Sequence, residues 1–287
     1  MSRLPPRIAQ RLETAFGRRI DSARLLPGGC IADVWRIHFD DDETVVAKVA
    51  ENGGLTTEAF MLRYLEAHSP LPVPQVWQAD DDLLVLADLG GGGRLTPAAQ
   101  RDAAEHVAAL HQVTAPAFGL NSDTLIGPLV QPNPPTQSWV QFFREHRLMY
   151  MGRLAQERGH LSPRVFMMLK GLCAKLTDYI PEPPAACLIH GDLWTGNVIV
   201  DRESGRLAGF VDPAIYYADP EIELAFGTLF GTFGEPFFAR YAELALLRPG
   251  FFETRRDLYN LYPLLVHTVL FGSSYARSVE RTLEQYV

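Results

Sequence analysis

The sequence predicts an α+β fold of two lobes, a small N-terminal lobe rich in antiparallel β-strands and a larger, mostly helical C-terminal lobe. Short β-branched and apolar runs separated by turn residues recur through the first 89 residues, whereas helical spacing of apolar residues dominates after residue 93. Between these parts, four consecutive glycines interrupt regular structure. We therefore expect an N-terminal lobe over residues 1–89, a hinge over 90–93 and a C-terminal lobe over 94–287.

The composition is that of a globular chain of 287 residues, 47% hydrophobic and 21% charged. A net charge of −8 argues against nucleic-acid or anionic-membrane partners, because both need clustered Lys and Arg. The chain start lacks the apolar core of a secretory signal, and polar residues interrupt the apolar stretch 258–271, so we expect no membrane segment. Three cysteines without metal-ligand spacing fit a reducing environment, and the expected location is the cytoplasm.

The N-terminal lobe is expected to begin with an amphipathic helix over 5–17, followed by two strands within 24–39 and a third over 44–49. Gly28 and Gly29 lie between the first two strands, where the lack of a Cβ would let backbone N–H groups approach phosphate oxygens. A tight hairpin would explain these glycines equally well. Cys30 beside them is either a redox-sensitive thiol near the nucleotide or a small buried hydrophobe.

Lys48 stands in the third predicted strand, like the Lys of the V-A-I-K strand in kinases. An ammonium in a buried strand needs an anionic partner, because it is costly to desolvate unpaired. Glu58, on a helix expected over 56–67, is the candidate partner. Such a pair orients the α- and β-phosphates of ATP in kinases, although most helical Glu residues are simply solvated.

Two further strands are expected over 75–79 and 83–87, joined by an acidic turn over 80–82 that should face solvent. The second of these strands leads into Ala87, Asp88 and Leu89, just before the glycine run. We expect adenine to lie against these three residues, bound by backbone groups.

In the second lobe, Thr96 and Pro97 predict the start of a helix that reaches His111, which we expect to be packed or hydrogen-bonded. A Pro-, Asn- and Gly-rich loop is expected over 115–135, then an aromatic-rich helix from Trp139, a helix over 163–179 and further helices over 236–283. Before the last group, Asp219-Pro220 predicts a helix N-terminus. Glu221 and Glu223 should then cap this helix and support a loop.

The stretch from Ile189 to Asn197, with a second carboxylate at Asp212, has the spacing of a kinase catalytic loop. Asp192 and Asn197 stand five residues apart, as in H-R-D-x-x-x-x-N, and the apolar run 207–211 should deliver Asp212 at a strand end. We interpret Asp192 as the catalytic base, and Asn197 and Asp212 as Mg²⁺ ligands, since Mg²⁺ prefers a few oxygen ligands completed by phosphate and water. Taken singly, a His-Gly-Asp or an Asp-Pro turn would be weak evidence.

These residues resemble the fructosamine kinase (ketosamine 3-kinase) family, in the aminoglycoside/choline phosphotransferase-like branch of the protein-kinase-like fold. The resemblance spans nearly the whole chain. It rests on His190 to Asn197 with Trp194 inside it, Gly28 to Ile31, Trp139 to Leu148, Val211 to Ala214, Phe118-Gly119 and Gly127.

The resemblance implies ATP- and Mg²⁺-dependent phosphorylation of the sugar 3-hydroxyl of ketoamines, which are adducts of glucose or ribose with amines or protein lysines, as a deglycation repair. Because Trp194 lies in the catalytic loop itself, we hypothesise that it forms an aromatic wall for the sugar or its amine substituent, and we expect Tyr216 in the same site. Two positions depart from the family pattern, Glu223 where Asp is common and Ala87 where an acidic residue is common. Both leave local hydrogen bonding open.

Two other functions remain open from the sequence. One is a small-molecule kinase for an aminoglycoside, choline or similar amino alcohol, and the other is a nucleotide-binding module without catalysis. The complete set of kinase groups argues against the second. The sequence leaves open which ketoamine is used, whether it is free or protein-bound, and whether the expected monomer or a dimer forms.

Overall fold

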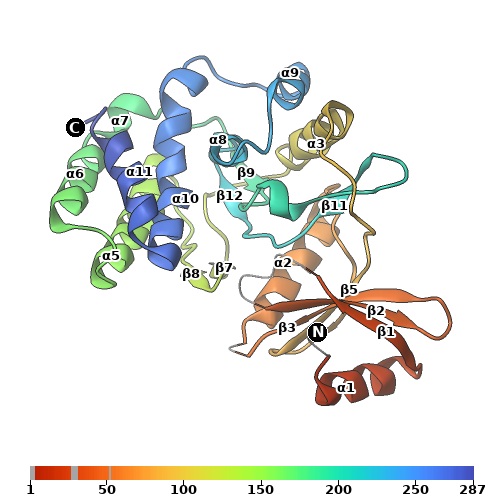
Figure 1. Cartoon of the computed structure of the whole chain (residues 1–287). Coiled ribbons are helices and arrows are strands. Elements are labelled where there is room, and N and C mark those ends of the chain that lie inside the picture. Colours follow the sequence, from red (N-terminus) through yellow and green to blue (C-terminus); the bar gives the residue numbers. More distant parts are fainter. Residues whose placement is uncertain (1–3, 27–31, 52) are drawn as a thin grey trace.

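The computed structural model describes residues 4–26, 32–51 and 53–287 (Figure 1). Its N-terminal part is a five-stranded antiparallel sheet in the order β1-β2-β3-β5-β4. The strands are β1 (Ile20–Leu25), β2 (Asp33–Phe39), β3 (Thr44–Val49), β4 (Val76–Ala79) and β5 (Leu83–Ala87). The predicted β-rich lobe is therefore confirmed. The β-branched content of β3 and the continuous apolar sequence of β5, buried at four of its five residues, fit strands that lie inside the sheet.

Both faces of this sheet are covered. Helix α1 (Pro6–Phe16) buries Ile8 and Leu12 against Trp35 and other residues of one face. Helix α2 (Leu55–His68) packs against the other face, where Leu84 belongs to its cluster. Because successive strand residues point to opposite faces, alternation alone decides which helix each side chain meets. Lys48 pairs with Leu84 across β3 and β5 and so shares the α2 face.

The acidic turn between β4 and β5 faces solvent as predicted, with Asp80 and Asp81 exposed, and it also makes contacts that the sequence analysis did not predict. Arg11 of α1 binds Asp82 at 2.8 Å and Asp80 at 2.7 Å. Asp81 accepts a hydrogen bond of 3.0 Å from the backbone N–H of Gly54, at the start of α2. The turn thus ties α1 to the sheet and fixes the first turn of α2.

The glycine run leads from β5 into a mostly helical part, drawn from yellow to blue in Figure 1. Its helices are α3 (Pro97–Leu110), α4 (Trp139–Phe142), η1 (Phe143–Leu148), α5 (Met149–Glu157), α6 (Pro163–Cys173), α7 (Leu176–Tyr179), α8 (Glu221–Leu229), α9 (Glu235–Leu244), η3 (Phe251–Arg255), α10 (Arg256–Phe271) and α11 (Ser273–Leu283). Trp139 is fully buried and stacks on Phe142 and Phe143, so these aromatics form the core, as predicted. The lobe boundary at 90–93 stays a prediction.

Short strands hold the loops of this part together. They are β6 (Thr114–Ala115), β7 (Thr124–Ile126), β8 (Leu129–Gln131), β9 (Ala186–Ile189), β10 (Val198–Val200), β11 (Leu207–Phe210) and β12 (Tyr216–Ala218). The β7–β8 hairpin lies inside the predicted loop 115–135, and the predicted helix 163–179 breaks after Cys173; both are corrections. Three-residue strands carry too little periodic signal to be predicted.

Among the residues that the structure describes, no helix is long and apolar enough to cross a membrane.

Candidate active site

The turn after β9 carries the first group of the site. The backbone O of His190 accepts a hydrogen bond of 2.7 Å from the backbone N–H of Ala214, beside the β9–β12 pairing. Gly191 adopts φ +86°, and a Cβ at this position would lie 2.1 Å from the backbone O of Ala214. A side chain is therefore excluded, which explains why glycine stands where the protein-kinase pattern has Arg.

Asn197 binds the predicted base, Asp192, through two hydrogen bonds. Its Nδ2 donates to the backbone O of Asp192 at 2.8 Å and to Oδ2 at 2.9 Å, across the short helix η2 (Thr195–Asn197). Burial raises the pKa of Asp192 to about 7, with a second contribution from the carboxylate of Asp212. The five-residue spacing therefore brings both groups together, and a carboxyl with this pKa can accept a proton near neutral pH.

Asp212 reaches the same place from the β10–β11 hairpin. The backbone N–H of Val211 donates to the backbone O of Asn197 at 3.0 Å, which sets the end of β11 against the catalytic loop. Asp212 adopts φ +56°, and its side chain is 46% exposed. This left-handed backbone turns the carboxylate out of the β11 direction, toward the Lys48 ammonium with which it forms an ion pair.

The expected ion pair between Lys48 and Glu58 is present, with Nζ 2.6 Å from Oε1. Burial by itself would lower the pKa of Lys48, but the carboxylates of Asp212 and Glu58 outweigh it and raise the pKa. Lys48 therefore stays protonated, and its ammonium group is held in place at β3 by the two carboxylates. Three groups expected to meet a nucleotide, from β3, α2 and the end of β11, converge here.

The residues present fit a Mg²⁺ ion. Asn197 uses Nδ2 for both bonds to Asp192, which leaves Oδ1 as an oxygen ligand on the other side of the amide. Asp212 supplies a half-exposed carboxylate. One amide oxygen and one carboxylate, completed by phosphate and water, suit Mg²⁺ rather than a metal that needs several His or Cys ligands. No cluster of three His, Cys, Asp or Glu suitable for a metal occurs among the described residues.

Glu223 supports the catalytic turn from behind. Its Oε1 accepts a hydrogen bond of 2.7 Å from the backbone N–H of Gly191, and its Oε2 lies 2.9 Å from Nε2 of His111. The other ring nitrogen of His111 lies 2.8 Å from the hydroxyl of Tyr241. Two sequence-based interpretations are confirmed: Glu223 supports a loop, and His111 is hydrogen-bonded. The predicted capping of α8 by Glu223 is wrong, because both of its carboxylate oxygens are used by the catalytic turn and His111. The longer Glu side chain reaches the turn at this departure from the family pattern.

Trp194 lies in the catalytic loop and is half-buried. A Cβ on Gly196 would lie 2.6 Å from its ring, so the indole folds over Gly196, and its edge also contacts Phe230. Tyr216 is only 1% exposed and lies against the guanidinium of Arg147, 3.9 Å from the ring centroid. Its ring is therefore enclosed within the C-terminal part of the chain. The substrate roles of both residues stay predictions.

The expected nucleotide contacts are placed only in part. Gly28, Gly29 and Cys30 lie outside the described residues. The backbone N–H of Ala87 donates to the backbone O of Gln75 at 2.9 Å, so adenine recognition would fall to other backbone groups of 87–89.

Asp88 is held by Arg36, a partner that sequence reasoning missed. The guanidinium Nε lies 2.8 Å from Oδ2 of Asp88. Strand alternation places Arg36 on the same face of the sheet as Lys48. This alternation was the sequence feature from which the position of Arg36 could have been predicted.

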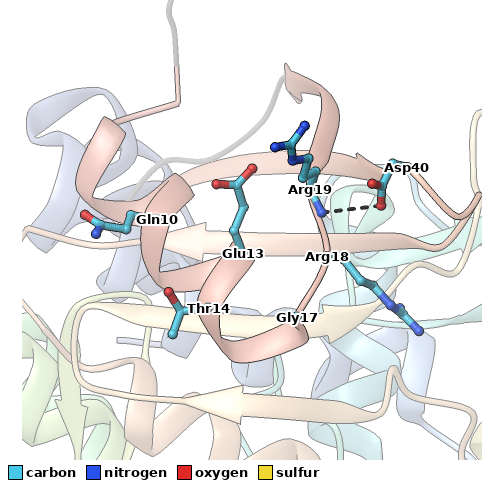
Figure 2. Close-up of a pocket in the computed structure, with 7 residues that line it drawn as sticks. All are labelled: Gln10, Glu13, Thr14, Gly17, Arg18, Arg19 and Asp40. Atoms are coloured by element: carbon cyan, nitrogen blue, oxygen red, sulfur yellow. Dashed lines mark hydrogen bonds between the residues drawn. The ribbon is translucent and has the colours of Figure 1, made fainter.

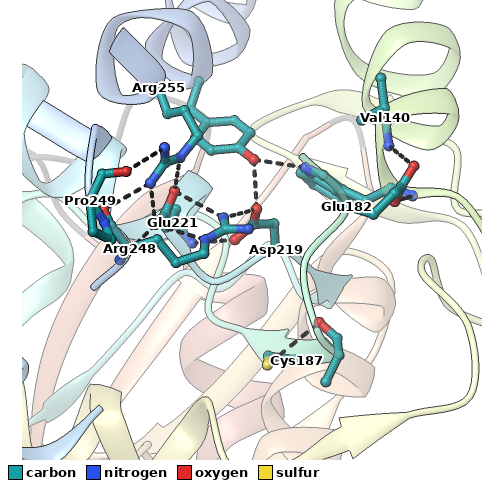
Figure 3. A network of polar contacts seen from close by, with 11 residues as sticks. Val140, Glu182, Cys187, Asp219, Glu221, Arg248, Pro249 and Arg255 are labelled. Atoms are coloured by element: carbon teal, nitrogen blue, oxygen red, sulfur yellow. Dashed lines mark hydrogen bonds and ion pairs between the residues drawn. The ribbon is translucent and has the colours of Figure 1, made fainter. Parts of the chain in front are cut away.

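A buried ion-pair network at the start of α8 was also missed (Figure 3). Glu221 binds Arg255 through Nε at 2.5 Å and Nη2 at 2.9 Å, and it binds Nε of Arg248 at 3.0 Å. Asp219 accepts a hydrogen bond of 2.7 Å from Tyr259. Glu221 therefore forms ion pairs with Arg248 and Arg255, and the prediction that it caps α8 is wrong. Helix α8 begins at Glu221, one residue later than expected. The network anchors the helix that carries Glu223.

The surface hollow shown in Figure 2 is unrelated to these groups. It is lined by Gln10, Glu13, Thr14, Gly17, Arg18, Arg19 and Asp40. Because α1 packs on the sheet face opposite α2, this hollow is separated by the sheet from Lys48.

Comparison with known proteins decides the family. A family model described as fructosamine kinase matches residues 5–287. The chain belongs to the fructosamine kinase family. As a fructosamine kinase family member, it is a phosphotransferase, and ATP use follows from the family and the fold. One relative, the "Probable ketoamine kinase" of Synechocystis sp., is 34% identical over 288 residues, which cover 97% of this chain and 95% of that protein.

Solved structures confirm the fold of this fructosamine kinase family member. A crystal structure of a candidate fructosamine-3-kinase from Thermobifida fusca superposes with a TM-score of 0.84 and 30% identity, covering 96% of this chain and 97% of that one. An aminoglycoside phosphotransferase bound to ADP and hygromycin B superposes with a TM-score of 0.66 at 16% identity, covering 97% of both chains. The second likeness shows the protein-kinase-like fold alone.

Proposed function

We propose that this protein transfers the γ-phosphoryl group of Mg-ATP to the 3-hydroxyl of the sugar in a ketoamine. The substrate class is the fructosamine or ribulosamine adducts of amines or protein lysines, and the reaction would serve deglycation. The observation that carries the proposal is the convergence of Asp192, Asn197, Asp212 and Lys48 in a chain of the fructosamine kinase family. A nucleotide-binding module would not need a base with the pKa of Asp192.

The proposed mechanism assigns one task to each group. Asp192 accepts the proton of the attacking sugar hydroxyl. The oxygen of that hydroxyl forms a bond to the γ-phosphorus while the bond between the γ-phosphorus and the β-phosphate oxygen breaks, and ADP is released. Lys48, oriented by Glu58, binds the α- and β-phosphates. Asn197 and Asp212 would hold Mg²⁺, which neutralises phosphate charge when bound.

Trp194 and Tyr216 are proposed to belong to the substrate site. The indole of Trp194, two residues after Asp192, offers an aromatic wall to the sugar or to its amine substituent. An unchanged ketoamine KM in Trp194→Ala would show that this role is wrong. All the proposed catalytic groups come from one chain, so we propose a monomer as the active species. The cytoplasmic location stays a prediction.

The first experiment is ADP release with Mg-ATP and a panel of fructosyl-lysine, ribulosyl-lysine, an aminoglycoside and choline. Asp192→Asn tests the base, and Glu203→Gln, an exposed acid on the neighbouring β10–β11 turn, is the matched control. Turnover that requires a ketoamine and is lost only in Asp192→Asn would support both reaction and base. Turnover with only the aminoglycoside or choline would replace the proposed substrate, and ATP binding without any turnover would favour the binding module.

A further inference from the structure

Five aromatic side chains form a connected strip that starts in the catalytic loop. We call this set the aromatic strip: Trp194, Phe230, His267, Phe271 and Tyr275. The ring centroids of Trp194 and Phe230 are 6.3 Å apart, those of Phe230 and His267 are 5.0 Å apart, and those of His267 and Phe271 are 5.6 Å apart. Tyr275 lies 5.0 Å from His267 and 6.0 Å from Phe271. Residues from the catalytic loop, the C-terminal end of α8, α10 and α11 thus form one aromatic surface.

The strip is exposed where apolar rings would ordinarily be buried. Phe230 is 40% exposed and Phe271 is 54% exposed, although both contact other rings that could have covered them. Scattered exposed rings are common, but a contiguous exposed set next to a reaction centre marks a binding surface. Its solvent-facing area is therefore available to a ligand.

The strip is continuous with the proposed substrate site. Trp194 stands two residues after Asp192, and the hydroxyl of Thr195 lies 3.0 Å from that of Thr232, which ties the catalytic loop to the segment after α8. Phe230 belongs to that segment. A molecule whose sugar hydroxyl reaches Asp192 can therefore extend its other end across Trp194 and Phe230 toward Phe271.

The strip carries no positive charge of its own near neutral pH. Burial lowers the pKa of His267, whose Nδ1 also lies 2.7 Å from the backbone O of Pro263. Its ring is therefore neutral and adds to the aromatic surface. Neutral ring faces attract a cationic amine and pack well against apolar or aromatic groups.

We propose that the aromatic strip binds the amine substituent of the ketoamine and makes the enzyme prefer adducts of amines with apolar or aromatic substituents. This inference rests on the proposed function. The sugar must present its 3-hydroxyl to Asp192, so the amine attached two carbons away must leave the reaction centre along a neighbouring surface. In a ketoamine this nitrogen is a secondary ammonium, which matches the ring faces.

The test compares two ketoamines with the same sugar, the fructosyl adducts of methylamine and of phenethylamine. The quantity measured is the ratio of their kcat/KM values, aromatic over methyl, by ADP release. Phe271→Ser and Phe230→Ser probe the strip. Phe252→Ser is the matched control, because Phe252 is also 40% exposed but packs on Phe238 and Phe251, outside the strip.

We expect a wild-type ratio well above one and a fall of about three- to tenfold in each strip variant, the range of one aromatic contact. Most of the fall should appear in KM, and Phe252→Ser should keep the wild-type ratio. A ratio near one in the wild type, or an equal ratio in all four proteins, would overturn the inference while leaving the proposed function intact. Failure to phosphorylate either adduct while Mg-ATP binds would instead overturn the proposed function.

Discussion

Removing the Glu221 carboxylate is expected to be among the most damaging single changes outside the catalytic groups. Glu221 is 1% exposed and accepts hydrogen bonds from the guanidiniums of Arg248 and Arg255. In Glu221→Ala, Arg248 would keep Asp219, and Arg255 would keep only the backbone oxygens of Pro249 and Arg248. The guanidinium of Arg255 would then be a buried charge without a carboxylate partner, which strongly destabilises a folded protein.

The expected loss is about 3–5 kcal/mol in the free energy of unfolding, the range for breaking a buried ion pair from one side. Urea unfolding at pH 7 measures it. The control is Glu243→Ala, whose carboxylate is 64% exposed and pairs with Arg240, so less than about 1 kcal/mol should be lost. The double variant Glu221→Ala/Arg255→Met should lose less than the single variant, because the unpaired charge is removed.

The pH dependence gives a second check of the same network. Burial would raise the pKa of Glu221, but hydrogen bonds from Arg255 and Arg248 outweigh it and lower the pKa. A carboxyl whose pKa is lowered in the folded state stabilises the fold when the pH is above its ordinary, unfolded-state pKa of about 4.3. This stabilisation is lost as the pH falls through the folded-state pKa. The difference between wild type and Glu221→Gln should therefore shrink below about pH 4. Equal stabilities of Glu221→Ala and Glu243→Ala at pH 7 would refute the reasoning.

Three further outcomes are expected. Because the pKa of Asp192 is about 7, kcat/KM should rise with pH up to about 7 and then level off; a flat profile between pH 5 and 8 would contradict a proton-accepting role. Gly191→Ala should abolish turnover and lower the melting temperature, since its Cβ would lie 2.1 Å from a backbone oxygen; wild-type kinetics would show that the turn can shift. Asp81→Ala should raise the KM for ATP severalfold by freeing the start of α2, and this effect should disappear in a Glu58→Gln background; equal effects in both backgrounds would make Asp81 merely structural.

Much of the N-terminal part was predictable because local chemistry and fold agree there. The β-branched run 44–49 matches strand β3, the second strand predicted within 24–39 matches β2, and the apolar spacing in 5–17 matches α1. The contacts of the acidic turn 80–82 were not predicted, because its partners, such as Arg11 and Gly54, are 27 or more residues away along the chain. Nothing in a local window reveals such a contact.

The sequence by itself determined which candidate catalytic and nucleotide-binding side chains the protein contains and the order in which they occur. The spacing of Asp192 and Asn197 within one turn, and a Lys on a β-branched strand, are local features that survive without knowledge of the fold. Their short separations left few alternative geometries.

Only the tertiary structure decided how distant groups meet. Lys48 and Asp212 are 164 residues apart yet form an ion pair, and Glu223 supports Gly191 from 32 residues further along the chain. The positive φ of Gly191 and the backbone O of Ala214, which a Cβ would approach to 2.1 Å, explain why glycine stands at this position. The aromatic strip is likewise assembled from segments 194–275 that no periodicity links. Packing brings these side chains together because the burial of apolar surface stabilises the complete fold and does not depend on any short stretch of sequence.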